Sequence, residues 1–213
     1  MAIDYTKKPQ QPTPQQGTPA PVSLSKVTLT KNAPAVSLTK GGSGTGMIRV
    51  NLNWHAQAAG GIDLDLGALY ESTDGQKGVV QALGNSFGNL YAPPYVFLDG
   101  DDRSGTNTAG ENLWINLDHA YSIRRVLVFA YIYEGAASFD YAQGVVTVFP
   151  AAGPQIEVRL DDPAGGARFC AIAMLYNSGN DLAINREIRY FQGGHSEMDR
   201  AYSWGMRWKQ ARK

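Results

Sequence analysis

The sequence contains a single cysteine among its 213 residues, which excludes an internal disulfide. This residue, Cys170, lies in the apolar run RFCAIAML, so we expect a buried core thiol. The three histidines, His55, His119 and His195, are isolated, and none has a cysteine or another histidine at zinc-ligand spacing. Neither a disulfide framework nor a zinc site is therefore expected.

Long hydrophobic runs are also missing. The longest apolar run, VLVFAYIY at residues 126–133, is far shorter than the roughly 20 residues that span a bilayer. Residues 1–21 are rich in Pro, Gln and Thr and lack the apolar region of a secretory signal, so we expect a disordered tail there. These features favour a soluble protein located in the cytoplasm.

The chain has no net charge, because 19 acidic residues balance 19 basic ones. A basic field over the whole protein is therefore absent, and we do not expect nucleic acid as a partner. The balance is uneven along the chain, since residues 61–118 carry nine acidic residues against two basic ones. This acidic middle favours a cation site over a phosphate site, although any single loop acid is more often simply solvated.

Sequence signatures of common enzymes are missing as well. No G-x-S-x-G, P-loop or dinucleotide-binding glycine pattern occurs, and GGSGTG at residues 41–46 lacks the lysine of a P-loop. Paired carboxylates could in principle hydrolyse a glycoside. The candidates here, Asp63 and Asp65, lie in a region with further acids, which suits a cation better than an acid–base pair.

Alternating apolar and polar residues predict short strands throughout residues 22–192. In MIRVNLNW, for example, Ile48, Val50 and Leu52 alternate with polar residues, and Asp74-Gly75 marks a hairpin turn. We expect strands at residues 22–26, 36–40, 47–54, 63–71, 79–83, 113–117, 124–133, 145–150, 155–160, 168–176 and 182–192. With turns between them, these segments predict an all-β sandwich of about ten mostly antiparallel strands.

Residues 193–213 predict a short C-terminal helix followed by a basic tail. Ser196 is the candidate N-cap, with Asp199 three residues later. Apolar positions at helical spacing run from Met198 to Trp208. We expect this helix to pack its aromatic face on the sandwich, and the rival hypothesis is a helix that lies on a membrane surface.

Two acidic segments are candidates for binding a cation. The first is GIDLDLGAL, where Asp63 and Asp65 share one face of a strand and repel each other. The second is the glycine-rich stretch 98–112, which contains Asp99, Asp101, Asp102 and Glu111 but lacks the ligand spacing of an EF-hand. Carboxylates and backbone carbonyls from both segments could bind Ca²⁺, with Mg²⁺ as the alternative.

These motifs together resemble the TerD family of tellurium-resistance and stress-response proteins. The likeness rests on VSLTKGG followed by IRVNLNW, on GIDLDLGAL, and on DGDDRSG…GENLWINL, and the ending FQGGHSEMDRAYSWGMRW resembles the TerA branch. The resemblance implies a calcium-binding β-sandwich in which the ligands fall on Asp63, Asp65, Asp101, Asp102 and Glu111. Asp102 stands where the family has Asn, and Asp99 is a reserve candidate.

The resemblance implies a non-enzymatic calcium-binding protein of the stress response, associated with resistance to tellurite and to phage and colicins. Its expected partners are the calcium ion and other tellurium-resistance proteins. The alternative hypothesis is a β-sandwich module that binds a membrane surface or a carbohydrate in a calcium-dependent way, with peripheral membrane association assisted by the basic tail.

Overall fold

The computed structural model describes residues 26–28, 35–37, 46–54, 62–102, 109–135, 138–162, 164–177 and 182–209. The structural statements below concern these residues. The predicted tail at residues 1–21, His55 and most of the GGSGTG turn lie outside them. So do residues 103–108 of the acidic stretch.

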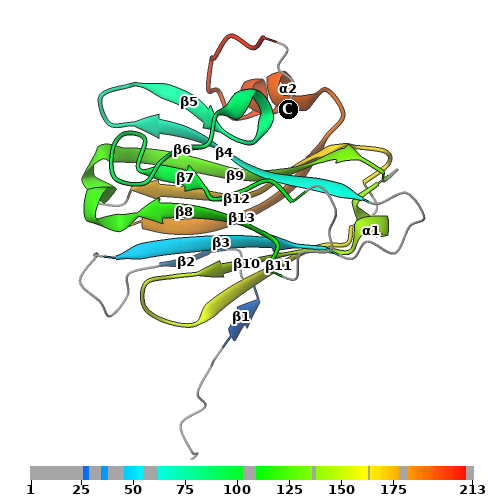
Figure 1. The fold of residues 1–213 in the computed structure, drawn as a ribbon, viewed down its shortest axis with the longest axis horizontal. Coiled ribbons are helices and arrows are strands. Elements are labelled where there is room, and N and C mark those ends of the chain that lie inside the picture. The colour runs from blue at the N-terminus through cyan, green and yellow to red at the C-terminus, as the bar shows by residue number, and fades with distance from the viewer. Residues whose placement is uncertain are drawn as a thin grey trace, which may run out of the picture.

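The strands form two sheets, which confirms the predicted all-β sandwich (Figure 1). The seven-stranded sheet has the order β1 (Lys26–Thr28), β11 (Gln155–Leu160), β10 (Gly144–Phe149), β3 (Met47–Asn53), β8 (Glu111–Asn116), β7 (Val96–Leu98) and β6 (Gly88–Asn89). The six-stranded sheet has the order β2 (Ala35–Ser37), β13 (Leu182–Phe191), β12 (Phe169–Asn177), β9 (Ile123–Glu134), β4 (Asp63–Ser72) and β5 (Lys77–Val80). The strand pairs are antiparallel except β1 with β11.

The alternating pattern of the sequence places the core between the sheets. Ile48, Val50 and Leu52 of β3 are fully buried and belong to the same apolar cluster as Leu64 and Leu66 of β4. Cys170 is also buried in this cluster, as predicted, and burial raises the pKa of its thiol. Hydrophobic burial between the sheets is therefore the main source of stability.

A second apolar cluster covers the outer face of the six-stranded sheet. Helix α2 (Gly194–Ala201) and the segment after it contribute Met198 and Trp204, both fully buried against Leu69 and Phe129. The predicted packing of this helix on the sandwich is confirmed, so these side chains are not available to a membrane surface. β4 is consequently buried on both faces along most of its length.

The boundaries of the C-terminal helix differ from the prediction. The N-cap is Gly193, whose N–H donates to the Glu197 carboxylate, so Ser196 lies inside the helix. The helix ends at Ala201, and the chain then turns through Gly205, which has a φ of +75°. Trp208 is therefore not helical. With eight residues, α2 is the longest helix in the described part of the chain, and none there can cross a bilayer.

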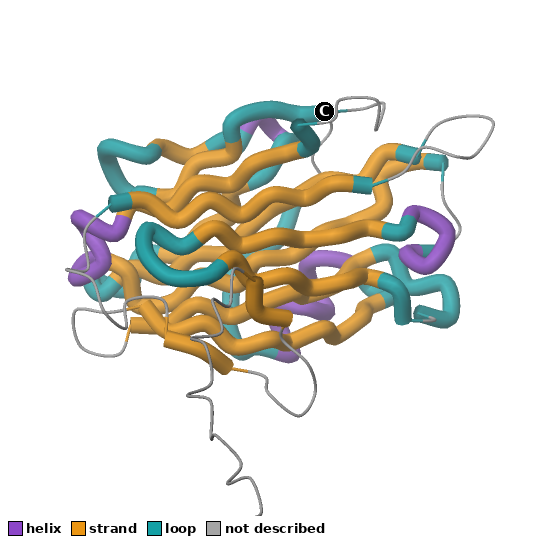
Figure 2. The backbone as a smooth tube through the Cα atoms, turned by 90° about the horizontal axis from the view of Figure 1, so that it is seen from below, coloured by secondary structure: helices purple, strands orange, loops and turns teal. Residues whose placement is uncertain are grey.

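Several short elements were placed wrongly or missed by the sequence analysis. β5 ends at Val80, before the end of the predicted strand 79–83, and Leu83 at the end of that prediction begins the 3₁₀ helix η1 (Leu83–Asn85). β6, β7, the 3₁₀ helix η2 (Leu117–Ser122) and α1 (Phe139–Ala142) were not predicted. These elements are too short to produce a periodic pattern in the sequence. Figure 2 shows that most of the described backbone is strand.

Candidate metal centre

The first half of β4 has a strand on one side only. β9 pairs with β4 along its length, whereas β5 pairs only with Ala68–Glu71. Within the described residues, no strand pairs with the other edge of residues 63–67. This edge is where the second acidic segment, between β7 and β8, approaches β4.

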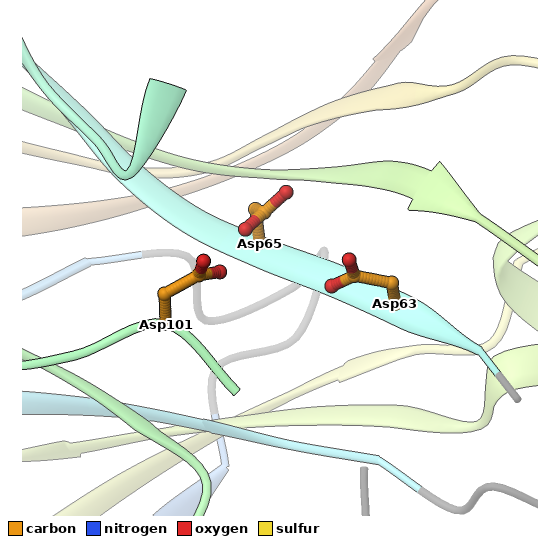
Figure 3. A group of neighbouring side chains, drawn as sticks. All are labelled: Asp63, Asp65 and Asp101. Carbon is orange, nitrogen blue, oxygen red and sulfur yellow. The ribbon is translucent and has the colours of Figure 1, made fainter. Parts of the chain in front are cut away.

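Three carboxylates gather at this edge (Figure 3). Asp63 and Asp65 project from β4, and Asp101 comes from the segment that follows β7. One oxygen of each lies within 4.8 Å of the others. Asp65 is fully buried and Asp63 is 6% exposed, so these charges are largely withdrawn from water. The donor set consists of oxygen atoms, which hard cations prefer, so the cluster could hold a metal ion.

Glu111, the first residue of β8, fastens the acidic segment to the free edge of β4. Its Oε2 accepts a 2.6 Å hydrogen bond from the Leu66 N–H, and its Oε1 accepts a 3.0 Å bond from the Asp102 N–H. The pKa of Glu111 is raised to about 9, mainly because burial disfavours its charged form. The charges of Asp65 and Asp101 raise this pKa further, whereas the two N–H donors lower it. Glu111 therefore lies near Asp65 and Asp101 while its oxygens accept hydrogen bonds from backbone N–H groups.

Gly110 allows Glu111 to reach this position. Its φ of +60° is in the left-handed region, and a Cβ at this residue would lie 2.1 Å from the Leu52 carbonyl oxygen. The Asn51 side chain holds the same stretch by donating to the Ala109 carbonyl over 2.7 Å. The close approach of the acidic segment to β3 thus requires glycine at residue 110.

Tyr131 is the neighbour of Asp65 on β9. The two residues are directly paired across the strands, and Tyr131 is buried. Burial raises the pKa of Tyr131, and the nearby Asp65 carboxylate raises it further. Tyr131 is not recognisable as a site residue from the sequence, because a tyrosine within VLVFAYIY is indistinguishable from a core aromatic. Trp54 supports the start of β4 by donating from Nε1 to the Ile62 carbonyl over 2.7 Å.

The two remaining aspartates of the acidic segment have different positions. Asp99, the reserve candidate, accepts from the Asn112 N–H and from Trp114 Nε1, so it anchors the segment to β8. Asp102 contributes its N–H to Glu111. The structure thus brings Asp63, Asp65 and Asp101 together, with Glu111 and Asp102 adjoining. Which of these residues bind an ion stays a prediction.

The fold and this cluster define a β-sandwich protein with a candidate metal centre between a strand edge and an acidic segment. No family model matches the sequence. The chain is 47% identical over 204 residues to tellurium resistance protein TerA of an Alcaligenes species, in a match that covers 90% of this chain and 60% of the relative. The chain therefore spans less than two thirds of the length of that relative.

Two solved structures share the fold. The first is a homologue of telluride resistance protein TerD from Streptomyces coelicolor A3(2), with a TM-score of 0.54, 21% identity, and coverage of 69% of this chain and 90% of that one. The second is a protein of unknown function, with a TM-score of 0.56, 16% identity, and coverage of 73% and 95%. Both structures show the same fold as this chain, and the similarity to tellurium-resistance proteins in sequence rests on the TerA match.

Proposed function

We propose that this chain is a non-enzymatic, calcium-binding protein that contributes to tellurium resistance. The observation that carries the proposal is the convergence of Asp63, Asp65 and Asp101, with carboxylate oxygens within 4.8 Å of one another. Like charges this close, two of them buried, repel each other strongly. A bound divalent cation would turn this repulsion into attraction and would join the rigid strand to the acidic segment.

The donor chemistry favours calcium over other divalent ions. Ca²⁺ accepts about 6–8 oxygen ligands in flexible geometry, and carboxylates together with nearby backbone carbonyls supply such ligands. Mg²⁺ demands a near-octahedral shell and keeps much of its water, while Zn²⁺ prefers the nitrogen and sulfur donors that this cluster lacks. In this proposal Asp63, Asp65 and Asp101 hold the ion directly, and Glu111 and Asp102 are the further candidates.

Calorimetric titration with Ca²⁺ tests the proposal. We expect the wild-type protein to bind calcium, and the double variant Asp63→Asn, Asp65→Asn to bind about 100-fold more weakly, because two of three charged ligands become neutral. Asp74→Asn is the matched control, since Asp74 lies exposed in the hairpin turn after β4. Equal calcium affinity of the double variant and the wild type would reject the site.

The link to tellurium rests on the relative named tellurium resistance protein TerA. We propose that the ion orders a surface for other tellurium-resistance proteins, and that the chain binds rather than catalyses. A strain that lacks this gene should regain tellurite tolerance with the wild-type gene and not with the Asp63→Asn, Asp65→Asn variant. Full tolerance with the variant would show that the carboxylate cluster is not needed.

A further inference from the structure

A hollow of about 550 Å³ lies where β5 and η1 meet the C-terminal segment at residues 206–209. These parts of the chain lie on the same side of the molecule (Figure 1). The hollow is distinct from the candidate metal centre, because none of the acidic residues discussed above lines it. Its volume is within the range of about 300–1,000 Å³ that is typical of small-molecule sites.

The lining of this hollow is basic. Lys77, Arg207 and Lys209 contribute to it, and among the described residues no Asp or Glu does. Lys77 is partly engaged, since its ammonium donates to the Trp204 carbonyl over 2.7 Å and lies 3.9 Å from Glu71. Arg207 and Lys209 are exposed at the opening. The charge therefore suits an anionic group of the ligand.

The rest of the lining is apolar and includes an aromatic ring. Leu83 and Met206 contribute aliphatic surface, and Trp208 contributes its indole. Trp208 is fixed in place, because it stacks on His195 at a centroid distance of 4.7 Å and its Nε1 donates to Asp199 over 3.1 Å. A fixed indole beside aliphatic side chains suits a flat, apolar part of a ligand.

The wall formed by residues 206–209 is held independently of any ligand. The buried carboxylate of Asp199 accepts hydrogen bonds from the N–H groups of Gly205 and Met206. Trp204, just before them, is fully buried and donates from Nε1 to the Tyr70 carbonyl. The hollow is thus preformed, which lowers the entropic cost of binding.

We propose that this hollow binds a small organic anion in which a phosphate, sulfate or carboxylate group is attached to a flat ring. The ring would lie against Trp208 and Leu83, and the anionic group would face Arg207 and Lys209. Binding at this site does not depend on the ion at Asp63 and Asp65.

The probe for the test is 1-naphthyl phosphate, which combines a flat ring with a dianion. Titration of the full chain in a calcium chelator, followed by calorimetry and by amide NMR signals, should show saturable binding that perturbs residues 77–86 and 206–209. Inorganic phosphate and neutral 1-naphthalenemethanol should each bind at least about tenfold more weakly. Equal binding of either one, or no binding of the probe, would overturn the proposal, and neither result bears on calcium binding.

Two variants locate the site. Arg207→Gln with Lys209→Gln should weaken probe binding about tenfold, since each exposed charge contributes modestly. Arg200→Gln is the matched control, because Arg200 is exposed on α2 but does not line the hollow. The double variant should keep the wild-type NMR spectrum elsewhere. Unchanged affinity of the double variant, or an equal loss with Arg200→Gln, would overturn the proposal.

Discussion

At the scale of single residues, Glu111 connects the strand to the acidic segment. Its two oxygens receive N–H groups from residues far apart in the sequence, Leu66 and Asp102. The resemblance implies that Glu111 is an ion ligand, and the structure adds this bracing role. A carboxyl group that accepts one buried and one partly buried N–H group is hard to replace, because a side chain with fewer acceptor oxygens leaves a donor unsatisfied.

The first prediction concerns this bracing role. Glu111→Gln replaces one acceptor oxygen with an NH₂ group that faces an N–H donor. The free energy of unfolding should fall by about 1–3 kcal/mol in urea titrations. Glu157→Gln is the control, because Glu157 pairs at 3.9 Å with the exposed Arg159 on β11, away from the acidic segment. A Glu111→Gln protein as stable as this control would contradict the bracing role.

His195 is a second residue whose environment should affect the stability of the fold measurably. It lies on α2, contacts the rings of Phe169 and Trp208, and its Nε2–H donates to Gln81 Oε1 over 2.6 Å. Burial lowers the pKa of His195 to about 4 from its usual value of 6.5. The folded protein therefore holds this imidazole neutral at pH values where the unfolded chain protonates it.

The second prediction is the resulting pH dependence. As the pH falls below 6.5, the unfolded state takes up a proton at His195 that the folded state does not. The free energy of unfolding should fall by up to about 1.4 kcal/mol per pH unit until the pH approaches 4. Urea titrations between pH 7 and 4 should show a shallower dependence for His195→Gln than for the wild type. Parallel curves would show that His195 titrates alike in both states.

At the scale of structural elements, the start of β8 depends on the glycine that precedes it. Gly110→Ala would place a methyl group against the Leu52 carbonyl and would strain a positive φ. We expect it to lower the free energy of unfolding by about 2–4 kcal/mol and to weaken calcium binding, because Glu111 and Asp101 would shift.

Gly153→Ala is the matched control for this third prediction. Gly153 also has a positive φ, of +95°, but no atom lies within 4 Å of the position a Cβ would take. It should cost only about 1 kcal/mol and leave calcium affinity unchanged. Similar losses at both positions would mean that the close approach of the acidic segment to β3 contributes nothing.

Among the elements, the long strands were predictable and the short connections were not. The alternation in MIRVNLNW predicted β3, and the apolar run VLVFAYIY after Arg124 and Arg125 predicted most of β9. β7 has only three residues, and its pairing with β8 depends on contacts distant in sequence. In the C-terminal segment, helical spacing continued to Trp208, but the Asp199 carboxylate binds N–H groups beyond Ala201 and ends the helix.

Part of the candidate site could also be predicted. Asp63 and Asp65 can be recognised as site candidates from the sequence, because two acidic residues on one face of a strand are unfavourable there. Asp101 meets them only through the sheet arrangement that brings the segment after β7 to the free edge of β4. Tyr131 and Gly110 carry no sequence signal of their own, since their roles follow from neighbours on other strands.

At the scale of the whole molecule, ion binding and stability are linked. An ion that binds only the folded chain raises the free energy of unfolding by about 2.7 kcal/mol when its concentration is 100 times its dissociation constant. Thermal unfolding of the wild type should therefore shift upward in Ca²⁺ relative to a chelator. The Asp63→Asn, Asp65→Asn variant should show no such shift, and an equal shift would assign the effect to another site.

The most direct test of the proposed metal centre is a crystal structure of the protein determined with calcium present. We predict one ion within about 2.3–2.6 Å of carboxylate oxygens from Asp63, Asp65 and Asp101, held between β4 and the segment after β7. Calcium bound elsewhere on the chain, with water alone among these three carboxylates, would contradict it.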